Sequence, residues 1–426
     1  MIETIRNAWK VVDLRKKLLY TLCLMIVFRF GSCIPVPMLD ADAMQQIFTS
    51  DNSLFGFINL VSGGAFQNAT IFAMSITPYI NSSIIMQLLC VAIPALERMQ
   101  KEGEEGRKKI AQMTRYGTVI LALIQAIGLY FLLRSYGAVT HPGFLSALVI
   151  VMTFSAGTAF LMWLGEQITE KGVGNGISLI IFAGIVSRVP SMAVSLYQYM
   201  LNGTMNIIGV ILLLIAALAV VGFVVWMNEA ERRIPVQYAK RVVGRKMYGG
   251  QSTHIPIKVA SAGVIPIIFA MSIMSFPGTL ASFFGVTAQS GGFWGGFLTV
   301  FSPTHWLYGI LYFFLIIFFT YFYTAIQFNP IEMANNMKKN GGFIPGIRPG
   351  RSTADYISKV LSKITLAGAI FLGIIAVLPI FMNVALRISN FAIGGTSLLI
   401  VVGVAIETVK QLESQMVMRH YKGFLD

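Results

Sequence analysis

The stretch from Gly63 to Leu89, "GGAFQNATIFAMSITPYINSSIIMQLL", carries two opposing signals. It is apolar enough to enter a membrane, yet it begins with two glycines and contains Pro78, Asn81 and Gln87. Polar and helix-breaking residues are tolerated at membrane depth where neighbouring helices or a water-lined cavity satisfy their hydrogen bonds. The stretch therefore indicates a span inside a helical bundle, and it predicts an all-α membrane protein.

The rest of the 426-residue chain has the same character, with 56% hydrophobic residues, 12% charged residues and a mean hydropathy of +0.72. Its apolar blocks are about twenty residues long, which is the length of a membrane-spanning helix. The short alternating strands of an outer-membrane barrel are absent. The blocks predict ten spans, at residues 18–34, 71–93, 116–133, 145–164, 177–197, 207–227, 259–284, 306–326, 364–382 and 391–409.

The charges between the blocks predict the orientation of the chain. An even number of spans places both ends on one side, and basic residues gather on the cytoplasmic side. Of the 32 Lys and Arg residues, all fall on the side of the termini except Arg29, Arg134, Arg188 and Arg387. We therefore expect both termini in the cytoplasm. The first apolar block has no small-residue cleavage site, so we expect it to be a retained span.

Two cytoplasmic connections, residues 228–258 and 329–359, are about thirty residues long, and loops of that length are usually functional. In the first loop, "RRIPVQYAK" and "STHIPIKVA" alternate apolar and polar positions, which predicts a β-hairpin with a basic tip. In the second loop, Pro and Gly recur through residues 343–350, which predicts a folded turn.

The tips of both loops carry basic side chains. Such charges can serve only to set the topology, or they can dock an acidic or phosphate-rich surface when a folded loop displays them rigidly. We expect the second role for the following residues: Arg241, Arg245, Lys246, Arg348 and Arg351.

The predicted membrane interior offers no catalytic or ion-coupling groups. Glu407 is the only acidic residue clearly within a span, and the four histidines lie in connections or tails. Ion-coupled transporters need such groups at mid-membrane. Motifs of nucleotide hydrolysis and proteolysis are absent, and "KGVGNG" at residues 171–176 follows no strand. The three cysteines lack the spacing of metal ligands. We therefore expect no enzyme activity, cofactor or metal.

Uncharged polar side chains do lie within the spans, namely Asn81, Gln87, Gln125, Ser272 and Ser275. Such residues commonly hold membrane helices together, and each contributes about 0.6 kcal/mol. Bonds that weak can also be exchanged. The residues therefore indicate either ordinary helix packing or a seam that opens without exposing a charge to lipid.

Five stretches of this sequence closely resemble the signature stretches of bacterial SecY, the pore-forming subunit of the Sec protein translocon. They are "GGAFQNATIFAMSITPYINSSIIMQLL", "KGVGNGISLIIFAGIV", "QYAKRVVGRKMYGGQSTHIPIKVASAGVIPIIFA", "GFIPGIRPG" and "GGTSLLIVVGVAIET". The resemblance covers essentially the whole chain. It implies a clamshell of two inverted pseudo-symmetric five-helix halves, residues 1–200 and 201–426, with a pore between them.

The resemblance also implies a plug, a short re-entrant helix at residues 55–70 that fills the closed pore from the external side. Its residues are Phe57, Gly63, Gly64 and Ala65. A constriction ring of isoleucines is implied at Ile76, Ile80, Ile84, Ile181, Ile185, Ile265, Ile268 and Ile400. The stripe that the first three form by helical spacing is also typical of ordinary packing. As a collar, it would exclude water and ions yet seal around a chain of almost any sequence.

The resemblance places a lateral gate between the second and third helices on one side and the seventh and eighth on the other. Asn81, Gln87 and Gln125 match gate-side positions, and Ser272 and Ser275 lie in the seventh span. An apolar segment in transit would gain about 0.3 to 0.6 kcal/mol per central Leu, Ile, Phe or Val by moving into lipid. Signal sequences would thus be sorted by partitioning.

The function implied by the resemblance is a channel that translocates unfolded secretory polypeptides and releases hydrophobic segments laterally. The implied partners are SecE-like and SecG-like small subunits, the SecA motor ATPase, the ribosome through its rRNA phosphates, signal peptides, secretory chains and membrane lipid. The implied location is the bacterial cytoplasmic (inner) membrane. The alternatives are a ten-helix secondary transporter of small solutes and an intramembrane enzyme, and both need a mid-membrane polar cluster that the sequence does not supply.

Overall fold

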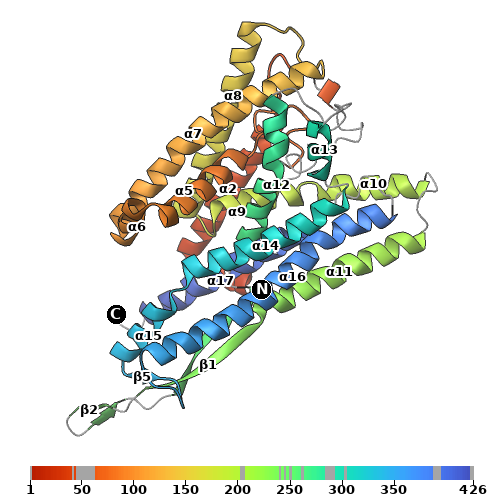
Figure 1. Ribbon diagram of the computed structural model, residues 1–426. Coiled ribbons are helices and arrows are strands. Elements are labelled where there is room, and N and C mark those ends of the chain that lie inside the picture. Colours follow the sequence, from red (N-terminus) through yellow and green to blue (C-terminus); the bar gives the residue numbers. More distant parts are fainter. Residues whose placement is uncertain are drawn as a thin grey trace.

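The computed structural model is mostly helical, with two small sheets at one end of the molecule (Figure 1). It describes residues 2–40, 43–44, 63–201, 207–238, 241–243, 246–248, 252–260, 263–283, 293–301, 305–386 and 395–422. The helical architecture agrees with the all-α class expected from the sequence. Both sheets are built from the two long loops.

The elements up to residue 201 form the first group. They are α1 (Ile2–Lys10), α2 (Val12–Gly31), α5 (Thr77–Ala92), α6 (Pro94–Lys101), α7 (Glu104–Ser135), α8 (Phe144–Lys171), α9 (Gly176–Val186) and α10 (Val189–Leu201). Helices α5 and α6 meet at an angle of 101°. Pro94 lies at this bend, because proline cannot continue a helix without removing a hydrogen bond.

The elements from residue 207 onward form the second group. They are α11 (Ile207–Glu229), β1 (Glu231–Tyr238), β2 (Arg241–Val243), β3 (Lys246–Tyr248), β4 (Ser252–Lys258), α12 (Ile265–Phe283), α13 (Phe293–Val300), α14 (Trp306–Gln327), α15 (Pro330–Lys339), β5 (Gly342–Phe343), α16 (Arg351–Leu386) and α17 (Gly395–Lys422).

Helix α12 lies between the two groups of helices (Figure 1). It packs against α14 on one side and against α7 and α5 on the other. Within the second group, α14 packs on α16 and α11 packs on α17. Helix α17 also contacts α1 and α9 of the first group. The two groups therefore meet in two places, through α12 and through α17.

Among the described residues, five helices are long and apolar enough to cross a membrane, or six if the bent pair of α5 and α6 is one span. The five fall on the predicted spans at residues 116–133, 145–164, 207–227, 306–326 and 364–382. Helices α9 and α12 contain shorter apolar stretches. The structure thus has the several apolar helices of a multi-pass protein, fewer by length and composition than the ten spans expected.

Several predicted spans differ from the helices observed. The seventh was expected to begin at Val259, but α12 begins at Ile265. The second span was expected to begin at Ile71, but α5 begins at Thr77 and residues 63–76 form turns. Ala69 and Ser75 have φ angles of 49° and 52°, which no α-helix contains. The fifth span, predicted as one helix at residues 177–197, is divided into α9 and α10.

The predicted β-hairpin of the first long loop is confirmed. Strands β1 and β4 pair antiparallel, with Ile234 opposite Ile255. Ile234, Val236 and Ile257 are buried at 2%, 0% and 2% exposure, while their neighbours along β1 are exposed. The basic tip forms its own two-stranded sheet from β2 and β3.

The second long loop holds more structure than the predicted turn. It contains α15, because the Asn329 side chain accepts hydrogen bonds from the backbone N–H groups of Ile331 and Glu332, and Pro330 opens the first turn. The loop then forms β5, which pairs with β1 through Gln237 and Phe343. Both long loops therefore share one sheet, in the order β4-β1-β5.

Candidate functional site

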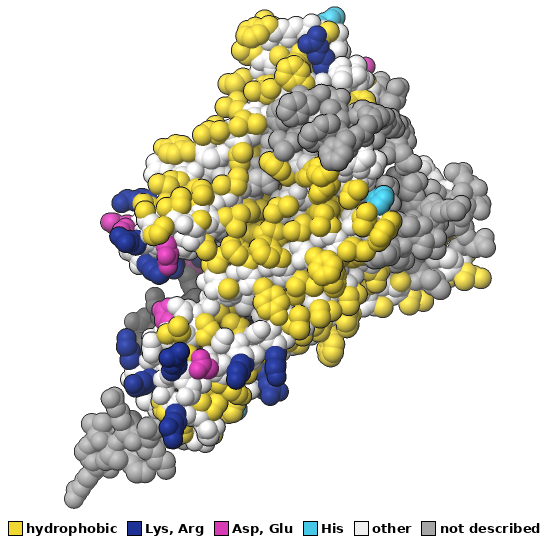
Figure 2. Space-filling model, viewed as in Figure 1, with side chains coloured by type: hydrophobic (Ala, Val, Ile, Leu, Met, Phe, Trp, Pro, Cys, Tyr) yellow, Lys and Arg dark blue, Asp and Glu magenta, His cyan; other side chains and the backbone are white. Residues whose placement is uncertain are grey.

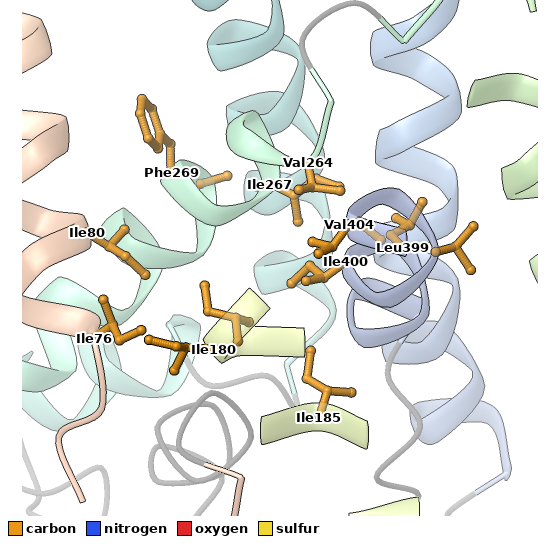
Figure 3. Packing of buried hydrophobic residues seen from close by; sticks show 14 of the residues in the cluster. Ile76, Ile80, Ile180, Ile185, Val264, Ile267, Phe269, Leu399, Ile400 and Val404 are labelled. Atoms are coloured by element: carbon orange, nitrogen blue, oxygen red, sulfur yellow. The ribbon is translucent and has the colours of Figure 1, made fainter. Parts of the chain in front are cut away.

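Seven of the eight isoleucines predicted to form a ring come from four helices, and Ile76 caps the start of α5; all eight lie in or against one hydrophobic cluster. Six are buried in it, namely Ile76, Ile80, Ile84, Ile181, Ile185 and Ile400. Ile265 and Ile268 of α12 are half-buried and pack against it. Figure 3 shows side chains of α5, α9, α12 and α17 converging from different directions. The structure thus brings together residues that are more than 300 positions apart in the chain, such as Ile76 and Ile400.

Among the described residues, no Asp, Glu, Lys, Arg or His side chain is buried, and the buried polar side chains are those of Ser and Thr, such as Ser82, Ser272 and Ser397. Among all the residues that the structure describes, no three His, Cys, Asp or Glu side chains lie close enough together to hold a metal ion. An ionisable group would hold water and ions at a constriction, whereas an aliphatic one excludes them. The arrangement is therefore suited to an apolar seal.

Sequence reasoning missed several side chains that converge on the same place. Ile180, Val264, Ile267 and Val404 are buried in the cluster and lie beside the predicted isoleucines (Figure 3). Their spacing gave a signal, because Val404 follows Ile400 by four residues and thus lies on the same face of α17. The predicted ring contains isoleucine alone, although the branched side chain of valine packs in the same way.

The predicted gate residues lie on the helices that meet at the α12 seam, which we define as the contact of α12 with α5 and α7. Asn81, Gln87 and Gln125 are half-buried, and they make no hydrogen bond within the described part of the chain. Ser272 is buried, and the Ser275 hydroxyl donates to its carbonyl at 2.9 Å within α12. The cross-seam bonds expected of the amides thus stay a prediction.

Helices α5 and α7 are themselves held closely together. The Ser82 hydroxyl of α5 donates to the Thr114 carbonyl of α7 at 2.8 Å. A Cβ at Gly117 of α7 would lie 2.6 Å from the Ser82 hydroxyl, so only glycine allows this approach. Since the two helices are joined by a buried hydrogen bond and a close contact, they can move as one unit against α12.

Two of the predicted plug residues, Gly63 and Gly64, adopt φ angles of 63° and 88°, which favour glycine. Gly63 lies against the backbone of Gly184 in α9, where an added Cβ would approach to 2.7 Å. The Arg29 side chain of α2 donates to the Gly63 carbonyl at 3.4 Å. Phe57 lies outside the described residues, as do the other residues of the segment up to residue 62.

The residues that follow, 65–76, are packed into the first group of helices. Ala65 is buried, and its carbonyl accepts hydrogen bonds from the backbone N–H and the hydroxyl of Thr70. Thr70 forms a β-bridge with Pro35. The Phe72 ring stacks between Phe28 and Phe160, with centroids 6.1 and 6.0 Å away. Ala65 therefore belongs to a tightly held segment.

The predicted docking residues lie at the end of the molecule that carries the sheets. Arg348 and Arg351 are exposed, and the Thr353 hydroxyl donates to the Arg348 carbonyl at 2.9 Å, which holds the turn. Arg351 begins α16 and does not lie on the turn itself. Figure 2 shows that Lys and Arg side chains gather toward this end, while hydrophobic side chains cover the middle. Arg241 begins β2 and Lys246 begins β3, whereas Arg245 lies outside the described residues.

The glycines of "KGVGNG" serve packing. A Cβ at Gly176 would overlap the Gly165 carbonyl, and one at Gly172 would overlap the Thr21 hydroxyl. Gly174 has a φ of 84° and lies against Thr408 of α17. The Asn175 side chain caps α9 by accepting from the N–H groups at residues 177 and 178. The loop is thus the point where α2, α8, α9 and α17 come together.

Comparison with known proteins identifies the family. A sequence model of the SecY family matches residues 70–409. The chain belongs to the SecY family. Two SecY relatives, each described as "Protein translocase subunit SecY", are similar over 100% of both chains: that of Halalkalibacterium halodurans at 48% identity and that of Bacillus subtilis at 47%.

Solved structures agree with this family in their fold. "The structure of a protein conducting channel" matches with a TM-score of 0.69 and 19% identity, covering 96% of this chain and 94% of the other. "Sec61 in the Canine ribosome-channel complex from the endoplasmic reticulum" matches with a TM-score of 0.65 and 18% identity, covering 96% and 94%. The helices described above therefore have the SecY-type arrangement.

Proposed function

We propose that this chain is the pore-forming subunit of a protein translocase, which passes unfolded secretory polypeptides across a membrane and releases hydrophobic segments into lipid. Membership of the SecY family supports this, since the relatives named above are translocase subunits. The observation that carries it is the cluster of buried apolar side chains formed where the two groups of helices meet, in a molecule whose described residues include no buried Asp, Glu, Lys, Arg or His. The chain is thus a channel subunit and no enzyme.

The proposed channel has ten spans arranged as two inverted halves, residues 1–200 and 201–426. The short apolar helices α9 and α12 and the bent pair α5–α6 supply spans beyond the five long ones. Both termini lie in the cytoplasm, and the membrane is the bacterial cytoplasmic membrane. The basic side chains at the end carrying the sheets support this orientation, because positive charge is retained on the cytoplasmic side.

The pore ring would act as a seal without specificity. Ile80, Ile185 and Ile400 converge from three helices (Figure 3). Branched aliphatic side chains contact any extended chain by van der Waals forces and form no hydrogen-bond pattern that selects a sequence. Water and ions are excluded at rest because a narrow apolar passage is poorly wetted.

The α12 seam would be the lateral gate. In lipid, separating apolar helices costs little hydrophobic free energy, because lipid tails are as apolar as the side chains they replace. Asn81, Gln87, Gln125, Ser272 and Ser275 would set how easily the seam opens. The segment at residues 55–70, with Phe57, Gly63, Gly64 and Ala65, would form the plug. A matching structure is described as having a plug domain that stabilises the closed state of a SecY channel.

The exposed basic residues would dock the partners that drive translocation. Arg348, on its hydrogen-bonded turn, presents a planar guanidinium to carboxylates or phosphates. One similar channel is described in complex with a ribosome. We propose that this chain binds the ribosome and a SecA-type motor through this surface, and that it assembles with SecE-like and SecG-like subunits.

Site-specific crosslinking of a stalled secretory chain tests the proposal. A cysteine replacing Ile80 or Ile400 should crosslink to the arrested chain. The matched control is Ile85→Cys, because Ile85 is 45% exposed on the same helix and points away from the cluster that holds Ile84. Equal crosslinking at Ile80 and Ile85, or none at the ring positions, would contradict a pore at this place.

A further inference from the structure

Several buried hydroxyl groups have no hydrogen-bond partner within the described part of the chain, and two of them lie next to the central cluster at matching places in the two groups of helices. These hydroxyls belong to Thr77, Ser155, Thr158, Tyr312, Thr365 and Ser397. A buried hydroxyl without a partner costs free energy, because it loses its bonds to water and gains none in return. Such groups are uncommon in folded proteins, so those of Thr77 and Ser397 need an explanation.

Helices α5 and α17 carry the same arrangement of side chains on one face. In each helix, a hydroxyl residue is followed after three and after seven positions by a branched aliphatic residue, and this spacing places all three on one face. They are Thr77, Ile80 and Ile84 in α5, and Ser397, Ile400 and Val404 in α17. The four aliphatic side chains are buried in the central cluster, and Figure 3 shows Ile80 and Ile400 approaching it from opposite sides. Each hydroxyl residue therefore lies about one helical turn from an isoleucine of the ring.

Both hydroxyls lie on the external side of the ring in the proposed orientation. Helices α5 and α17 belong to the second and the tenth span, and a chain with a cytoplasmic N-terminus runs through every even-numbered span from outside to inside. Thr77 is the first residue of α5 and Ser397 is the third residue of α17, so each precedes the ring isoleucines that follow it in its helix. A polypeptide in transit would therefore meet these hydroxyls directly after it leaves the ring.

The place of the two hydroxyls in the first helical turn explains why they have no partner. Deeper in the helices, threonine hydroxyls donate to the carbonyl four residues earlier, as the Thr118 hydroxyl does in α7 and the Thr408 hydroxyl does in α17, each at 2.7 Å. A residue in the first turn has no helical carbonyl four residues before it. The hydroxyls of Thr77 and Ser397 thus remain able to donate one hydrogen bond and to accept others.

A polypeptide that passes the aliphatic ring carries groups that the ring cannot satisfy. Each residue except proline has a backbone N–H and a carbonyl, and these groups lose their water in an apolar constriction. The ring isoleucines supply no donor or acceptor in exchange. A hydroxyl supplies both, and the backbone that it would bind is the same for almost every residue. Two hydroxyls beyond the ring would therefore bind a chain of any sequence without selecting among its side chains.

We propose that the Thr77 and Ser397 hydroxyls form transient hydrogen bonds to the peptide backbone of the chain in transit, on the external side of the isoleucine ring. The ligand is an extended polypeptide backbone, and each group of helices contributes one contact. This inference rests on the proposed function, since it requires that a polypeptide passes the ring.

The rate at which an inserted chain completes its passage tests the proposal in the full-length channel assembled with its small subunits. A secretory chain is arrested inside the channel and then released, so that gate opening does not contribute to the rate. Thr77→Val with Ser397→Ala removes both hydroxyls, and we expect the rate to fall about fivefold because the passing backbone loses its bonds. The control pair, Thr365→Val with Ser155→Ala, removes unpaired hydroxyls buried in α16 and α8 and should leave the rate unchanged. Equal rates for the two pairs would overturn the proposal.

The chemistry of the passing segment separates a backbone contact from a side-chain contact. Segments of Gly–Ala repeats and of Asn–Gln repeats have the same backbone, so the double variant should slow both by the same factor. A loss confined to the Asn–Gln segment would mean that the hydroxyls bind side chains, and it would overturn the proposal. Thr77→Ser keeps a hydroxyl and should keep the wild-type rate, whereas a loss as large as that of Thr77→Val would contradict the assigned role.

Two further measurements on the double variant complete the test. Resting ion conductance should stay at the wild-type level, because both substitutions are apolar. A changed conductance with an unchanged rate of passage would assign the hydroxyls to the closed channel and overturn the proposal. If the arrested chain still crosslinks to Ile80→Cys in this variant, the proposed function stands even where the backbone contact fails.

Discussion

Two regions of this molecule each bury branched aliphatic side chains, and burial has a different effect in each. The three-stranded sheet packs Ile234, Val236 and Ile257 in a small core with α15 and the start of α16. The membrane cluster gathers Ile80 and Ile400 with residues of many helices. In water, burial of aliphatic surface supplies the stability of the sheet. In a membrane, lipid is as apolar as the side chains, so the same burial adds little stability.

The surrounding solvent therefore determines how much stability a buried aliphatic core contributes. The core of the three-stranded sheet supports a surface that carries Arg348 and Arg351, and loss of this core should unfold that surface. In the proposed channel the polypeptide passes through the membrane cluster, and a polar substitution there should alter the seal while the helices remain folded. Four substitutions test whether the two regions differ in this way.

The largest effect is expected from Val236→Asp. Val236 is fully buried, and an unpaired carboxylate in its place should cost about 3 kcal/mol or more of local stability. Because β1 pairs with both β4 and β5, both long loops should lose their structure, and motor-driven translocation should fall to background. The control is Gln237→Asp, the next residue, which is exposed. Normal translocation by a stably inserted Val236→Asp channel would contradict the view that this buried core holds both long loops in their folded form.

The double variant Ile80→Asn and Ile400→Asn should keep the fold and lose the seal. Two amides in the cluster would admit water, so resting ion conductance should rise at least about tenfold and defective signal sequences should be accepted. Ile80→Val with Ile400→Val is the control, since it keeps the branched apolar surface. Planar-bilayer conductance measures the effect. If the Asn variant keeps wild-type conductance and wild-type signal selectivity, the isoleucine ring does not seal the pore.

The sequence predicts the strands of the long loops better than the ends of the membrane helices. Period-two alternation identified β1 and β4 because one face of each strand is buried and the other is exposed to water. In the membrane both faces of a helix are apolar, so hydropathy locates a span but does not define its ends. Hydropathy therefore predicts a helix at residues 71–76, which the positive φ angle of Ser75 excludes.

The isoleucine ring could not be predicted from local sequence patterns alone. Ile76, Ile80 and Ile84 form a stripe that is typical of any packed helix, and only family resemblance joined it to Ile400. The glycines at residues 172–176 resemble a phosphate loop only in composition, and that role is rejected because no strand precedes them; their tertiary contacts account for them. Contacts between segments far apart in the chain leave no local pattern. The capping of α15 by Asn329 did leave one, because Asn before Pro is typical of a helix start.

A smaller effect is expected from Arg348→Lys. The turn that carries Arg348 is held by Thr353 and contains Gly346 and Gly350 at φ angles of 80° and 107°, so the side chain is displayed from a defined position. Lysine keeps the charge but loses the planar fork, and we expect motor-driven translocation to fall about fivefold. Arg351→Lys, at the start of α16, should change the rate less. A wild-type rate for Arg348→Lys would mean that charge alone suffices there.

The smallest effect is expected from Asn81→Leu, which concerns the seam and not the seal. Asn81 is half-buried and makes no hydrogen bond among the described residues, so leucine loses no such bond and gains contact area. Opening the seam would let water hydrate the amide, an advantage that leucine lacks. The closed state should therefore gain about 0.6 kcal/mol, which is about threefold in the opening equilibrium. Export of a graded series of signal sequences measures the shift, and the weakest signals should be rejected first. Easier export of weak signals would reverse the sign argued here and would indicate that Asn81 stabilises the closed seam through a bond formed only in the assembled channel.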